Sequence, residues 1–98
     1  MMRRSKKSEF HHGIFHGMMN VLESATTLSI FEWSEAAREV AILAAKVKTE
    51  KWPEFRPNCD SLETAYNYGF DEGLMDGWEN DEQLNETIKR IRLTIQTL

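Results

Sequence analysis

The chain has 98 residues, of which 41% are hydrophobic and 29% are charged, and its formal net charge is −4. These values fit one globular domain, exclude a wholly disordered chain and argue against direct nucleic-acid binding. A single cysteine excludes an internal disulfide framework. No apolar run approaches the roughly 20 residues that span a bilayer, so the sequence predicts a cytoplasmic protein that does not enter the membrane.

The chain begins with a basic segment, residues 1–7, which contains Arg and Lys residues and no acid. Helical periodicity follows, so we expect a flexible basic arm and then one helical domain over residues 8–98. Ser8 is the expected N-cap of the first helix, which should end near Ala25. Residues 26–31, TTLSIF, are interpreted as the frayed end of this helix and a turn, with a helical extension or a short strand as alternatives.

The second helix is predicted over EAAREVAILAAKVKTE, with Ser34 as its N-cap and with acids early and lysines late, as the helix dipole favours. Pro53 and Pro57 in the next segment, KWPEFRPNCD, predict a break, because proline restricts the residue before it to extended conformations. Trp52 and Phe55 are expected to fold this linker onto the core. The expected apolar stripe of the second helix is Trp33, Ala37, Val40, Ala41, Ala44 and Val47.

Asp60 or Ser61 is the expected cap of a third helix, which should end at Asn80 or Asp81 and be followed at once by a fourth. The fourth helix, DEQLNETIKRIRLTIQTL, has an apolar stripe at helical spacing. Four helices with short connections predict an all-α protein, a small bundle of about four helices arranged as two helical hairpins.

The third helix contains an unusual ridge of small residues: Ala65, Gly69, Gly73 and Gly77 are spaced four apart. Three glycines inside a helix cost on the order of 3 kcal/mol relative to alanine, so a close contact should offset them. Our first interpretation is close packing against another helix of the same chain, because small residues let backbones approach. A homodimer seam and a groove for a partner or ligand are the alternatives.

The first helix repeats this pattern. FHHGIFHGMMNVLE (residues 10–23) aligns without a gap with YNYGFDEGLMDGWE (residues 66–79), which pairs Gly13 with Gly69 and Gly17 with Gly73. We therefore expect the two glycine faces to lie against each other, across the core or across a dimer axis. YNYGFDEGLMDGW also resembles the glycine-and-tryptophan pattern of the small ribosome modulation factors; those proteins are strongly basic where this segment is acidic, and no function is inferred from the resemblance.

Residues 60–86 carry nine acidic residues and no Lys or Arg. On a helical wheel, four acids of the third helix fall opposite its apolar half, with Glu63 near its start as the exception; the four are Asp71, Glu72, Asp76 and Glu79. They form the predicted contact to a basic protein surface, with two aromatic anchors; a solvated helix face is the alternative. The predicted contact residues are Tyr68, Asp71, Glu72, Asp76, Trp78, Glu79, Asp81 and Glu82.

No pattern in the sequence predicts catalysis, a metal or a cofactor. His12 and His16 share a helical face, but a metal site needs three or four ligands, so they are weak candidates. Cys59 has no flanking signature of a nucleophile.

The sequence thus predicts a non-enzymatic protein-binding module. Its size and charge are like those of the accessory proteins of phages and mobile elements, some of which inhibit host enzymes by imitating the charge of DNA. The alternative function is a structural or regulatory homo-oligomer packed through the ridge that runs from Ala65 to Gly77.

Overall fold

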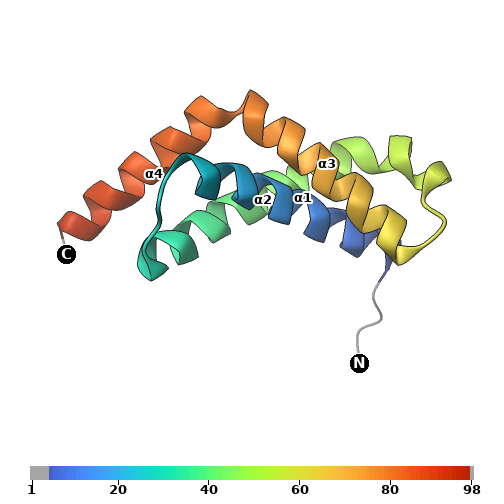
Figure 1. Ribbon diagram of the computed structural model, residues 1–98, viewed down its shortest axis with the longest axis horizontal. Coiled ribbons are helices and arrows are strands. Elements are labelled where there is room, and N and C mark those ends of the chain that lie inside the picture. Colours follow the sequence, from blue (N-terminus) through green and yellow to red (C-terminus); the bar gives the residue numbers. More distant parts are fainter. Residues whose placement is uncertain (1–4, 98) are drawn as a thin grey trace.

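The computed structural model describes residues 5–97, and Figure 1 shows how they are arranged. The elements are α1 (Lys6–Ala25), α2 (Ile30–Phe55), a 3₁₀ turn η1 (Arg56–Asn58), α3 (Leu62–Glu79) and α4 (Asp81–Gln96). The described residues contain no strand, so the predicted all-α bundle of about four helices is confirmed. Across residues 5–97 no helix is both long and apolar enough to cross a membrane.

α1 begins earlier than the sequence predicts, because Ser5 and not Ser8 is its N-cap. Ser5 Oγ accepts a hydrogen bond from the Ser8 amide at 3.0 Å, and the Ser5 amide donates to Ser8 Oγ at 3.2 Å. This reciprocal capping box satisfies amides that would otherwise lack partners at the start of a helix. Lys6 and Lys7 therefore lie in the first turn of α1 and not in a flexible arm. Residues 1–4 of the expected arm lie outside the described residues.

α2 also begins earlier, at Ile30, with Ser29 as its N-cap. The Ser29 amide donates to Glu32 Oε1 at 2.8 Å, and Ser29 Oγ accepts from the Glu32 amide at 3.2 Å. Ser34, the predicted cap, lies inside the helix. Within the uncertain segment, residues 26–29 connect the two helices and residues 30–31 are helical.

α2 continues through Pro53 to Phe55, so the predicted break before this proline is wrong. Pro53 lies in the last turn, where the lost amide donor removes one intrahelical hydrogen bond. Trp52 and Phe55 pack on Phe10 of α1, with ring centroids 5.4 Å and 5.2 Å away. Burial of these rings stabilises the last turn. The expected packing of both side chains onto the core is confirmed.

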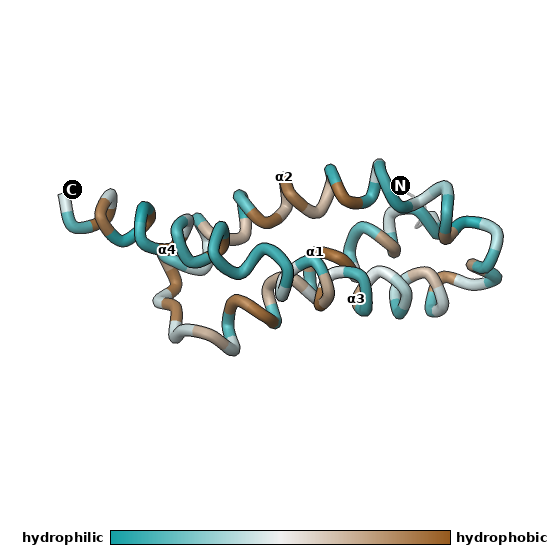
Figure 2. The backbone as a smooth tube through the Cα atoms, turned by 90° about the horizontal axis from the view of Figure 1, so that it is seen from above, coloured by the Kyte–Doolittle hydropathy of each residue, from teal (hydrophilic) through white to brown (hydrophobic). Residues whose placement is uncertain are grey.

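α1 is the central helix of the core. Its four fully buried large side chains are Phe10, Ile14, Met18 and Leu22. α2 packs on it through smaller residues, which are Ala36, Val40, Ala44 and Val47. Figure 2 shows α2 along one side of the molecule with α1 and α3 beside it. The apolar stripe of α4 faces the core through Leu84, Ile88 and Ile91.

α1 and α3 run in the same direction and pack through their glycines. Gly17 faces the backbone between Phe70 and Leu74, and a Cβ built on Gly17 would lie 2.8 Å from the Leu74 amide nitrogen. A Cβ on Gly73 would lie 2.9 Å from the Cα of Ile14. Both distances are shorter than real Cβ contacts, so only glycine permits this approach of the two backbones.

The contact between α1 and α3 has an internal two-fold relation. Each glycine approaches the carbonyl oxygen three residues before its counterpart in the aligned segment. The four contacts are Gly13 with Tyr66, Gly69 with Phe10, Gly17 with Phe70 and Gly73 with Ile14. Glycines held against carbonyls in this way favour weak Cα–H···O contacts. The two glycine faces were expected to lie against each other across the core or across a dimer axis, and in this chain they do so across the core.

Packing within the chain also covers the ridge of small residues on α3, for which the sequence left a homodimer seam as an alternative. All four ridge residues, Ala65, Gly69, Gly73 and Gly77, are buried within the chain. A second copy could reach them only if α1 left its place. The folded chain therefore does not present this ridge as a seam between copies.

Candidate functional site

The buried residues of α3 are Ala65, Gly69, Gly73 and Gly77, whereas the helical wheel predicts a broader apolar half in which glycines alternate with large side chains. Trp78, which the wheel placed at the edge of the apolar half, is 70% exposed. The four acids are divided as a consequence: Asp71 and Glu79 are exposed, whereas Glu72 and Asp76 are half-buried beside the glycines. The predicted single acidic face of α3 is therefore wrong. Because α3 contacts the backbone of α1 through its glycines, the smallest residues of α3 face the core.

Glu72 and Asp76 lie against α2. Glu72 Oε1 is 3.9 Å from Lys51 Nζ. Burial raises the pKa of both carboxyl groups; neighbouring acids raise it further, chiefly Asp76 for Glu72 and Glu79 for Asp76, while Lys51 opposes the shift. Asp76 Oδ2 is buried without a hydrogen-bond partner. These two carboxyl groups are thus poorly placed to contact another molecule.

Tyr68 is packed inside the fold. Its ring centroid lies 5.4 Å from that of Phe55, and it joins the partly buried side chains around the core. Tyr68 is therefore not the exposed anchor that the sequence predicted.

Trp78 and Met75 are the exposed apolar side chains at the C-terminal end of α3, at 70% and 58% exposure. Beside Trp78 lies a pocket of about 190 Å³ between the end of α1 and the start of α4. Val21, Leu22 and Leu84 contribute its apolar walls. Exposed apolar groups beside a concave site are typical of protein-binding surfaces.

The exposed acids near Trp78 give this region its charge. We call Met75, Trp78 and the four acids Asp71, Glu79, Asp81 and Glu82 the Trp78 surface. α3 has no basic residue in its last turn, although the helix dipole favours cations there. Helix stability therefore does not account for Glu79 at this end of α3, whereas Asp81 and Glu82 lie in the first turn of α4, where the dipole favours acids.

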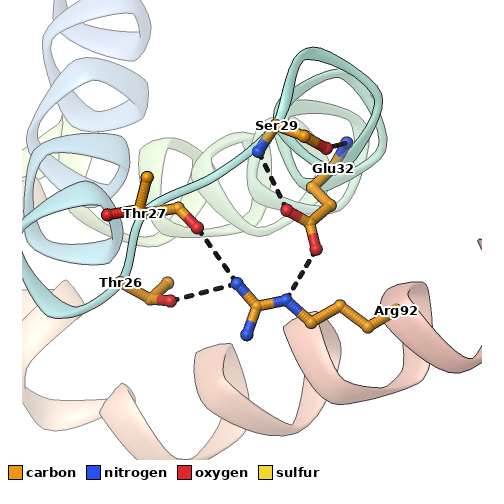
Figure 3. Close-up of polar contacts among 5 residues, drawn as sticks. All are labelled: Thr26, Thr27, Ser29, Glu32 and Arg92. Atoms are coloured by element: carbon orange, nitrogen blue, oxygen red, sulfur yellow. Dashed lines mark hydrogen bonds and ion pairs between the residues drawn. The ribbon is translucent and has the colours of Figure 1, made fainter.

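Sequence reasoning missed the network that holds α4, which Figure 3 shows. Arg92 Nε donates to Glu32 Oε2 at 2.6 Å, and its Nη2 donates to Thr26 Oγ1 at 3.2 Å and to the Thr27 carbonyl at 3.0 Å. The pKa of Glu32 is lowered, first by the Ser29 amide and then by Arg92. The network ties α4 to the connection between α1 and α2, and so holds the helix that closes one side of the Trp78 pocket.

The histidines lie together without a third ligand. The ring centroids of His12 and His16 are 4.5 Å apart, and His16 Nδ1 lies 2.8 Å from the Tyr66 hydroxyl. Within residues 5–97 no group of three His, Cys, Asp or Glu side chains is arranged to hold a metal. His11 carries no sequence signal, yet its Nε2 is buried without a partner, and burial lowers its pKa.

The single cysteine is part of the core. Cys59 is buried and packs with the other core side chains. Burial raises the pKa of its thiol, with Asp60 adding to the shift and Lys6 opposing it. A buried, protonated thiol is a poor nucleophile.

The structure thus separates the predicted site: Trp78 and Asp81 line the same pocket, Asp71, Glu79 and Glu82 are exposed on α3 and at the start of α4, and Tyr68, Glu72 and Asp76 are packed elsewhere. The pocket beside Trp78 is new, since its walls come from three helices. Comparison with protein-family models, with curated proteins and with solved structures finds no match to this chain.

Proposed function

We propose that this protein is a protein-binding module whose Trp78 surface engages a basic surface of another protein. Trp78 and the pocket beside it bind an apolar side chain of the partner, and the surrounding acids pair with its Lys or Arg residues. The observation that carries the proposal is a tryptophan at 70% exposure beside an apolar pocket, within a sequence segment, residues 60–86, that is rich in acids and contains no Lys or Arg.

The apolar part of the surface supports the proposal because tryptophan and methionine are enriched in protein interfaces. Tryptophan is also among the residues that carry most of the binding energy when they are buried by a partner. The pocket gives such a partner a place to insert a side chain next to the indole ring.

The charged part of the surface supports a basic partner in particular. Asp71 and Glu79 are exposed, and no ion pair joins either of them to another described residue. Acids in this setting attract cationic surfaces, raise the rate of association and suppress acidic competitors. Because exposed charges are screened by salt, binding should weaken as the ionic strength rises.

The test compares two exposed apolar residues. The full chain is immobilised as wild type, Trp78→Ser and Ile42→Ser, and proteins captured from the native host are quantified. Ile42 is the matched control, because it is 72% exposed on α2, away from the pocket. A partner should be lost with Trp78→Ser and kept with Ile42→Ser. With the purified partner, Trp78→Ser should raise Kd roughly 30-fold, as expected of an interface hot spot.

The charge is tested with two double variants that remove the same net charge. Asp71→Asn with Glu79→Gln should weaken binding and reduce its salt dependence. Glu35→Gln with Glu86→Gln should leave both unchanged, because these acids form exposed ion pairs on other helices. The proposal fails if both double variants bind alike, or if affinity is the same at low and high salt.

A further inference from the structure

A second hollow, of about 270 Å³, lies between α1, α3 and the start of α2, and it shares no lining residue with the Trp78 pocket. Its walls combine aromatic rings with one carboxylate. The residues that form them include Phe15, His16, Trp33, Tyr66, Phe70 and Glu23. We call this hollow the aromatic groove.

The rings and the carboxylate are held in place before any ligand arrives. Trp33 Nε1 donates to Glu23 Oε1 at 2.6 Å, which links α2 to α1 and fixes both side chains. The Tyr66 and Phe70 rings stack at 6.3 Å, and the Tyr66 hydroxyl is hydrogen-bonded to His16 at 2.8 Å. Such prior ordering reduces the entropy lost on binding.

The groove has the chemistry of a site for an organic cation. Aromatic faces carry negative electrostatic potential and attract cations that lie over them. Glu23 adds a full negative charge at the edge of these rings, and none of the residues that line the groove is Lys or Arg. Burial lowers the pKa of His16, so its imidazole is neutral near pH 7 and does not repel a cation.

We propose that the aromatic groove binds a guanidinium group, which stacks on its rings and donates a hydrogen bond to Glu23. A guanidinium fits better than an ammonium because it is planar, less strongly hydrated and able to stack on aromatic faces. One oxygen of Glu23 accepts from Trp33, and the other has no hydrogen-bond partner among the described residues. The group is supplied by an arginine side chain or by a free guanidinium compound. The site is independent of the Trp78 surface and of the function proposed for it.

The experiment is an NMR titration of the full wild-type chain, followed at the Trp33 indole N–H, which a Trp33→Phe variant identifies. N-ethylguanidinium should shift this signal saturably, and ethylammonium should bind more weakly. N-ethylurea, which has a similar shape but no charge, should bind at least about fivefold more weakly, as expected when the cation–π attraction is lost. Equal affinity for N-ethylurea and N-ethylguanidinium overturns the proposal, as do shifts at Trp78 alone.

The role of Glu23 is tested by Glu23→Gln, which should weaken N-ethylguanidinium roughly fivefold and leave N-ethylurea unchanged. Glu35→Gln, on the exposed surface of α2, is the matched control and should have no effect. A blocked Gly-Arg-Gly peptide distinguishes the sources of the cation. Binding as tight as that of N-ethylguanidinium supports an arginine side chain, and exclusion of the peptide supports a free compound. If Glu23→Gln binds like the wild type, Glu23 is not the counter-ion and the proposed site is wrong.

Discussion

The glycine contact between α1 and α3 makes a quantitative prediction, because two glycines of the same helix meet different obstacles. A Cβ at Gly73 would overlap the carbonyl oxygen of Ile14 and lie 2.9 Å from its Cα, which is backbone that cannot rotate away. A Cβ at Gly77 would lie 2.9 Å from Cγ2 of Val21, which is a side chain that can shift. The two substitutions to alanine therefore differ in what must move.

The magnitudes follow from two opposing terms. Alanine gains up to about 1 kcal/mol over glycine in a helix interior. Overpacking a tight contact costs about 1–3 kcal/mol, and a backbone obstacle lies at the upper end of this range. Gly73→Ala should therefore lower the free energy of unfolding by about 1–2 kcal/mol, whereas Gly77→Ala should change it by about 0.5 kcal/mol or less.

Urea denaturation of the wild type and both variants, followed by circular dichroism, measures these differences. In thermal unfolding, each kcal/mol corresponds to about 4–8 °C for a domain of this size. A Gly73→Ala variant as stable as the wild type would refute the close backbone approach. Equal losses for Gly73→Ala and Gly77→Ala would contradict the distinction between a backbone obstacle and a side-chain obstacle, because helix propensity alone favours alanine at both positions.

Three further predictions concern charged and polar contacts. Arg92→Gln should speed amide hydrogen exchange in α4 and leave α1 and α3 protected. The control Arg90→Gln loses only an exposed ion pair, so it should leave exchange in α4 unchanged. Equal exchange in both variants would contradict the anchoring role of Arg92. The folded-state pKa of Asp76 is raised above its ordinary value of 3.8, so the native state binds this proton more tightly than the unfolded chain, and stability from this group is lost as pH rises above that value. Asp76→Asn should therefore be more stable than the wild type near pH 7 and less pH-dependent, as measured by urea denaturation across pH; a variant that is less stable at neutral pH would oppose this reasoning. The His16 imidazole should titrate below 6.5 in a proton NMR pH series, because burial disfavours its charged form, and a midpoint at or above that value would contradict this effect of burial.

The helix count and the packed glycines were predictable because both depend on local patterns. The i, i+4 spacing of Gly69 and Gly73 predicts a stripe of small residues on α3, whichever helix packs against it. The aligned glycines of α1 indicated that α1 is that helix. The boundaries of α2 were less predictable. Ser29 and Glu32 have the spacing of a capping box, but Ser29 lay within the segment interpreted as a turn, residues 26–31, and Glu32 directly after it. Pro53 disfavours a helical conformation at Trp52, but packing of the Trp52 ring on Phe10 of α1 outweighs this local preference.

The candidate site was only partly predictable because the rotation of α3 depends on its partner. The helical wheel placed Trp78 at the edge of the apolar half, from which it was predicted as an exposed anchor, and it grouped Glu72 and Asp76 with the solvated acids. Contact through glycines instead places the smallest residues innermost, which exposes Trp78. Arg92 carried no local signal at all, since the partner of its side chain, Glu32, is 60 residues away in sequence.

The parallel pairing of α1 and α3 has a consequence for the order in which the molecule can assemble. Gly13 and Gly69 are separated by more than half the chain, so the tightest contact closes a long loop. Closing such a loop reduces the entropy of the chain before the new contacts stabilise it, so contacts between residues far apart in sequence slow folding. During synthesis, the glycine face of α1 stays open to solvent until α3 has been made. The two halves of the repeat therefore stabilise each other only late, and a fragment that ends before α3 lacks the closest packing in the fold.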